Sequence, residues 1–133
     1  MKHQIATTPE QSQRLIACGI NPESADMFYT NYTTKPNDKA PCAKTAPLGI
    51  RKDLIPAWSL SALLELLPRK INDHDLETTL ALSPSRYSKR WIIEYIDGDV
   101  SDTLHSFCGF SLVEGCVLMI EWLTANGYTL NTK

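Results

Sequence analysis

The segment from Leu112 to Ala125 constrains the fold more than any other part of the chain, because it is a predicted helix with almost no polar face. Ser111 followed by Glu114 forms a capping box at its start, and Asn126-Gly127 is a helix stop. The apolar side chains cover most of the circumference: Leu112, Val113, Cys116, Val117, Met119, Ile120, Trp122 and Leu123. A helix of this composition must be largely buried.

Two further helices are predicted earlier in the chain. A capping box spans Thr8 to Gln11, with proline at the first helical position, and predicts a helix from Pro9 to Cys18. Gly19 supplies its left-handed stop. The run WSLSALLELLP at residues 58–68 carries one leucine stripe with helical spacing, capped by Ser59.

Four segments are rich in β-branched and aromatic residues or alternate as strands do. They are MFYTNYTT at 27–34, LETTLALS at 76–83, SKRWIIEYI at 88–96 and TLHSFC at 103–108. Asp97-Gly98 is a hairpin signal between the last two. The order of elements predicts a single α+β domain over residues 1–133: an antiparallel β-meander sheet of three to four strands, with two or three helices packed on one face.

The stretch at about 35–56 is predicted to be a long proline-rich basic loop. It holds four prolines, five Lys or Arg residues against two Asp residues, and few large apolar side chains. Loops of this length are uncommon in compact domains unless they are functional or disordered.

Composition places the chain among single soluble domains. It has 133 residues, 43% of them hydrophobic, and a formal net charge of -2. This balance excludes the broad positive surface of a general DNA-coating protein. The first residues lack the apolar region of a secretory signal, and the longest apolar stretch, Cys116 to Leu123, is too short to span a bilayer. We therefore expect a cytoplasmic location and no membrane association.

Two segments carry a resemblance: PAWSLSALLELLP at Pro56 to Pro68 and EGCVLMIEWLTANGY at Glu114 to Tyr128. They resemble a group of small uncharacterised proteins from gut Bacteroidetes, many of them encoded by prophages and mobile elements. The similarity extends to NPESADMFY at Asn21 to Tyr29. These are packing motifs, so the resemblance implies a stand-alone intracellular accessory protein of phage or mobile-element origin and no particular activity.

Catalytic and metal-binding patterns are weak. No CxxC pair exists among Cys18, Cys42, Cys108 and Cys116, so we expect reduced thiols, no metal and no cofactor. Cys42, beside Lys44, is the best candidate for a nucleophile in a Cys/His enzyme. Turn chemistry explains Asp73-His74-Asp75 and Asp97-Gly98-Asp99, and no glycine-rich phosphate loop is present.

Binding is the function that the sequence favours. Tyr, Trp and Arg commonly anchor protein interfaces, which makes a protein of unknown identity the expected partner and leaves the oligomeric state open. The candidate partner-binding residues are Tyr29, Tyr32, Lys44, Arg51, Lys52 and Trp58. The alternative is a single-stranded nucleic-acid binder, in which bases stack on aromatic residues interleaved with cations. Its candidate residues are Arg86, Tyr87, Lys89, Arg90 and Trp91, with Tyr95 and Phe107 on the same sheet.

Overall fold

The computed structural model describes residues 4–30, 42–43, 54–73, 76–86, 88–97 and 102–131. Within these ranges the helices are α1 (Pro9–Ala17), the single 3₁₀ turn η1 (Pro22–Ser24), α2 (Leu60–Leu66) and α3 (Leu112–Ala125). The strands are β1 (Met27–Thr30), β2 (Cys42–Ala43), β3 (Leu54–Ala57), β4 (Lys70–Asp73), β5 (Leu76–Pro84), β6 (Trp91–Ile96) and β7 (Thr103–Gly109).

The larger sheet has the strand order β4-β5-β6-β7 and contains the last three predicted strands in the predicted antiparallel meander. The first predicted strand, at 27–34, contributes β1 to a separate sheet. Tyr95 at the centre of the larger sheet pairs with Leu80 on β5 and with His105 on β7. The sequence does not predict strand β4, because its pattern near Asn72 indicates a polar turn. Ile71 of this short edge strand is buried, whereas Lys70 and Asn72 are exposed. One apolar residue is too few to show the alternation that identifies a half-buried strand.

A second, smaller sheet has the order β2-β1-β3. Its strands β2 and β3 correct the prediction of an uninterrupted loop at 35–56, since Cys42–Ala43 and Leu54–Pro56 pair with β1. Pro56 concealed β3, because proline cannot donate to a ladder and is found mostly on edge strands. Here β3 is indeed an edge strand. The other residues of 35–56 lie outside the described residues.

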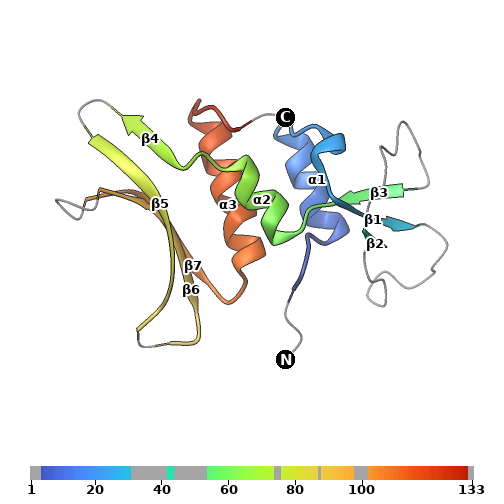
Figure 1. Cartoon of the computed structure of the whole chain (residues 1–133), viewed down its shortest axis with the longest axis horizontal. Helices are drawn as coiled ribbons and strands as arrows, with labels where there is room; N and C mark the ends of the chain where they lie inside the picture. Colours follow the sequence, from blue (N-terminus) through green and yellow to red (C-terminus); the bar gives the residue numbers. More distant parts are fainter. Residues whose placement is uncertain are drawn as a thin grey trace.

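Helix α3 lies between the larger sheet and the other two α-helices (Figure 1). It contacts β6 and β7 on one side, and α1 and α2 on the other. Six of its side chains are buried: Val113, Cys116, Val117, Met119, Ile120 and Leu123. This confirms the predicted burial of the helix and the α+β fold with helices on one face of the meander.

Local capping signals explain where the helices begin and end. The α1 box is complete: Gln11 N–H donates to Thr8 Oγ1 (3.2 Å) and Thr8 N–H donates to Gln11 Oε1 (3.0 Å). The predicted box of α3 is only half made, because Ser111 Oγ accepts from Glu114 N–H (3.2 Å) while the Glu114 carboxylate turns toward α1. Gly19 and Gly127 adopt φ of 92° and 80°, as expected for helix stops.

The segment after α3 returns across the end of α2. Asn131 N–H donates to Leu66 O (2.9 Å), and Asn131 Nδ2 donates to Glu65 O and Leu67 O (3.1 Å each). These bonds satisfy carbonyls that the end of a helix leaves without partners. The segment around Asn131 therefore packs against the C-terminal end of α2.

Candidate functional site

Two of the predicted partner-binding aromatic residues belong to the core, which corrects that prediction. Trp58 is 0% exposed and its Nε1–H donates to Ser24 Oγ (2.9 Å). Tyr29 is buried and its hydroxyl donates to Thr7 O (2.7 Å); this burial raises the pKa of Tyr29. Neither ring is available to a partner. The remaining predicted residues of that set lie outside the described residues: Tyr32, Lys44, Arg51 and Lys52.

The structure brings most of the alternative set together at the β5–β6 turn. Arg86, Lys89 and Arg90 are exposed, and Trp91 at the start of β6 is 41% exposed. A hydrogen bond from Ser85 N–H to Arg90 O (2.8 Å) closes the turn. Tyr87 lies outside the described residues.

Tyr95 does not join that exposed group, although it shares a sheet face with Trp91. It is 0% exposed, and its hydroxyl donates to Pro68 O (2.7 Å). Burial raises the pKa of Tyr95 well above its ordinary value. Tyr95 lies on β6, which α3 contacts, whereas Trp91 at the other end of β6 remains accessible.

Two apolar side chains that the sequence analysis missed extend this exposed area. Phe110 follows β7 and is 65% exposed, with the Arg90 guanidinium 5.0 Å from its ring centroid. Leu82 on β5 is 36% exposed. The start of β6 lies beside the end of β7, because Trp91 pairs with Gly109, the residue before Phe110. We call the group the aromatic–basic tip: Leu82, Arg86, Lys89, Arg90, Trp91 and Phe110.

A groove lies between α2 and β5 and reaches the tip at Leu82. It has a volume of about 650 Å³. Its apolar lining consists of Leu64, Leu67, Leu80 and Leu82, and its polar lining of Ser61, Glu65, Arg69 and Asn131. Because these side chains come from segments distant in sequence, no local pattern indicates the groove.

A smaller cavity of about 240 Å³ lies between the end of α1, α2 and the chain end. Its polar side chains are engaged within the protein: Ser24 Oγ accepts from Trp58, Thr124 Oγ1 donates to Ile120 O, and Asn131 bonds to α2. Among the residues that the structure describes, no buried side-chain polar atom lacks a partner. Ser24, Thr124 and Asn131 are therefore already engaged within the protein and are poorly placed to orient a ligand in this cavity.

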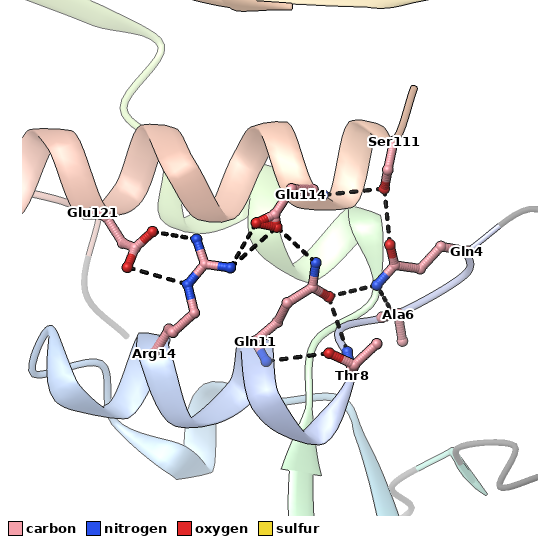
Figure 2. Close-up of polar contacts among 8 residues, drawn as sticks. All are labelled: Gln4, Ala6, Thr8, Gln11, Arg14, Ser111, Glu114 and Glu121. Atoms are coloured by element: carbon pink, nitrogen blue, oxygen red, sulfur yellow. Dashed lines mark hydrogen bonds and ion pairs between the residues drawn. The ribbon is translucent and has the colours of Figure 1, made fainter. Parts of the chain in front are cut away.

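A polar network joins α1 to α3 (Figure 2). Arg14 bonds to both Glu114 and Glu121, which lie seven residues apart along α3. Gln11 Nε2 also donates to Glu114 (2.9 Å). The hydrogen bonds and charges of Glu121 and Glu114 raise the pKa of Arg14 above its ordinary value, against desolvation. Arg14 therefore stays protonated and bonds to both carboxylates. The network positions α1 against α3 and does not act as an acid–base pair.

The cysteine and histidine geometry gives no support for a Cys/His enzyme in the described part of the chain. His105 stacks on Trp122 (4.1 Å between centroids, 6° between planes), and desolvation lowers its pKa. Cys108 is exposed and lies on the opposite face of β7, because Cys108 pairs with Ile92 whereas Phe107 and His105 share the face of Ile93 and Tyr95. Burial raises the pKa of the Cys116 thiol to about 12, which suppresses the reactive thiolate.

The two predicted turns and the candidate nucleophile Cys42 stay untested, because His74, Asp75, Asp99 and the Cys42 side chain lie outside the described residues. Across the ranges given above, no group of three or more His, Cys, Asp or Glu side chains is placed to hold a metal ion. Nor is any helix in those ranges both long and apolar enough to cross a bilayer.

The thiols provide a direct check of this arrangement. Under native conditions at pH 8, iodoacetamide should modify Cys108 and leave Cys116 unmodified, because Cys108 is exposed and the Cys116 thiol is buried with a raised pKa. Peptide mapping by mass spectrometry measures both. Modification of Cys116 in urea is the positive control, and its rapid modification in the native protein would contradict the packing of α3.

Comparisons with known proteins gave no relationship: no family model, no curated protein and no solved structure matches the chain. The functional argument therefore rests on the geometry of the tip and the groove.

Proposed function

We propose that the protein is a non-catalytic binding module that recognises another protein through the aromatic–basic tip. The observation that carries the proposal is the exposure of Trp91 and Phe110 beside three cations at one end of the sheet. Exposed aromatic residues and arginine are the side-chain types that most often anchor protein interfaces. Exposed apolar side chains that cluster on the surface of a domain commonly mark an interaction site.

The charge of the tip favours an acidic partner. Residues 83–93 contain Arg86, Lys89 and Arg90 and no acidic residue, in a chain whose formal net charge is -2. The guanidinium of Arg90 lies over the Phe110 ring, so one cation is already held against an apolar surface. A carboxylate-bearing segment with an apolar side chain complements both features.

Single-stranded nucleic acid is the second candidate, because Trp91 and the Arg90–Phe110 pair offer stacking surfaces beside cations. The buried position of Tyr95 removes one of the rings that the sequence offered for such stacking. Leu82 adds an aliphatic contact that bases do not require. These two observations favour a protein partner.

The proposal includes a cytoplasmic location and a role as a phage or mobile-element accessory protein. Free thiols at Cys18, Cys108 and Cys116 suit a reducing compartment. The accessory role rests on the sequence resemblance alone.

Reversing charge at the tip should weaken partner capture without unfolding the protein. We expect Arg90→Glu combined with Trp91→Ala to reduce the partner retained on the immobilised protein at least about tenfold, because hot-spot losses reach 2 kcal/mol or more. Quantitative mass spectrometry of pull-downs from native cytoplasm measures the retained protein. Nuclease treatment of half the lysate separates protein from nucleic-acid partners.

The control is Lys70→Glu, an equal charge reversal at an exposed lysine on edge strand β4, at the end of the sheet away from Trp91. It should leave capture nearly unchanged. Equal capture by the tip variant and the wild-type protein would contradict the proposal, as would capture that nuclease treatment abolishes.

A further inference from the structure

Strand β5 has a partly free edge beside the groove. Strand β4 pairs only with Leu76 to Thr79, and one more bond, from Leu80 N–H to Arg69 O (2.9 Å), ends that ladder. Strand β5 continues to Pro84. Figure 1 shows β4 beside one end of β5 only. The remainder of this edge therefore has no strand against it among the described residues.

The hydrogen-bond phase of the sheet identifies the backbone groups at this edge. Ser85 N–H bonds to Arg90 O across the β5–β6 pair, and Ser83 pairs with Ile92 in the same phase. Backbone groups alternate in direction along an antiparallel strand, so Leu82 N–H and C=O point away from β6. Leu80 N–H points the same way, toward Arg69, which confirms this phase.

Leu82 connects the groove with the free edge, because it lines the groove while its backbone N–H and C=O face that edge. Leu82 lines the groove together with Leu64 of α2 and Leu80 of β5. A strand laid along this edge would bond to Leu82 through its main chain. Its side chains would alternate between the two faces of the sheet, so every second one would enter the groove toward Leu64.

We propose that the partner binds as an extended acidic peptide segment that adds a strand to the Leu82 edge of β5, with alternate apolar side chains in the groove. This inference deepens the proposed function and rests on it. Main-chain bonding to a free strand edge is a common mode of peptide recognition, in which pockets for alternate side chains supply specificity. Pro84 has no N–H group, so the added ladder is short and centred on Leu82.

Charge complementarity identifies the acidic character of the segment. Along this path Arg69 lies at the groove, and Arg86, Lys89 and Arg90 lie at the tip. The acidic residue lining the groove is Glu65. Four cations against one carboxylate favour a segment with acidic residues at its ends and penalise a basic one. A second copy of this chain, which would bring its own tip cations against these, is disfavoured for the same reason.

The test selects a binder from a random 12-residue peptide library displayed on phage, and uses the best selected peptide, synthesised with a fluorophore, as the probe. Fluorescence anisotropy gives its Kd for the wild-type protein and three variants. Leu82→Pro removes the edge N–H group and the side chain, whereas Leu82→Ala removes only the side chain. Ser83→Pro removes an N–H group that faces β6, so it should lower the denaturation midpoint while Leu82→Pro leaves it nearly unchanged.

We expect selected peptides to be acidic with alternating apolar residues, and Leu82→Pro to bind about five- to tenfold more weakly than Leu82→Ala, the effect of one lost hydrogen bond. The second measurement needs no variant of the protein. N-methylation of single peptide bonds in the probe should weaken binding at alternate positions and have little effect at the intervening positions, because only alternate N–H groups of an added strand face β5.

Other results overturn the inference in distinguishable ways. If Arg90→Glu weakens the probe but N-methylation has no positional effect, strand addition is wrong and the proposed function stands. If no peptide is enriched while the tip variant still loses its cellular protein partner, the extended-segment inference alone fails. The last outcome uses a labelled 12-residue oligothymidylate. If this oligonucleotide displaces the peptide probe from the wild-type protein and does not bind the Arg90→Glu variant, the tip binds nucleic acid and both proposals fail.

Discussion

Trp58→Ala should lower the free energy of unfolding by about 3–5 kcal/mol, the range found when a large aromatic side chain is deleted from a packed core. Trp58 is 0% exposed and lies in the same buried cluster as Leu63 and Ile120. Its removal leaves a cavity, and it also leaves Ser24 Oγ without the indole N–H donor. Urea denaturation followed by circular dichroism measures the loss.

Trp91→Ala is the matched control, because the same atoms are removed from a side chain that is 41% exposed. We expect a loss below about 1 kcal/mol, as at most surface positions. Similar losses for the two tryptophans would contradict the assignment of Trp58 to the core and of Trp91 to the tip.

Ile120→Ala should lower the free energy of unfolding by about 2–5 kcal/mol through transfer and cavity terms. Ile120 is 0% exposed on α3, the helix that contacts both the sheet and the other α-helices. Surrounding elements therefore restrict the collapse that would reduce the cavity. Guanidinium denaturation gives the loss for this variant and its control.

The control is Leu118→Ala on the same helix, which removes as many carbon atoms from a side chain that is only partly buried. Its loss should be clearly smaller. If Leu118→Ala costs as much as Ile120→Ala, the rotational phase of α3 is wrong.

Local chemistry made the helices predictable. The bounds of α3 agree with the sequence prediction, and those of α1 differ from it by one residue, because caps such as Thr8 and Ser111 and the stop at Gly127 act over three or four residues. The meander was predictable for a similar reason, since alternation and hairpin signals are also short-range. What these signals determine is which element forms and where it ends.

The depth of burial along one sheet face was not predictable in this way. Trp91, Ile93 and Tyr95 alternate onto the same face of β6, yet Trp91 is 41% exposed and Tyr95 is 0% exposed. Alternation identifies the face of a side chain, but the helix packed on that face determines how much of it is covered. The same long-range packing buries Tyr29 and Trp58, which the sequence analysis assigned to a surface.

The candidate site could be predicted only in part. Three basic residues interleaved with two aromatic ones are visible in the sequence at 86–91, but Phe110 joins them through the β6–β7 register. The free edge at Leu82 depends on where β4 ends, and β4 itself has no sequence signal. A site that depends on strand pairing and on where a neighbouring strand ends gives little signal in the sequence of any single segment.

Chemical-shift mapping with the captured partner tests the central claim most directly. The three tryptophan indole N–H groups report on separate places: Trp91 at the tip, Trp58 in the core and Trp122 stacked on His105. In ¹H–¹⁵N spectra we predict that the partner shifts the Trp91 indole resonance and the backbone amides of Leu82 and Arg90, and leaves the Trp58 indole resonance unchanged. Shifts confined to the other end of the sheet, at Glu77 and Ile96, with Trp91 unaffected, would contradict a binding site at the aromatic–basic tip.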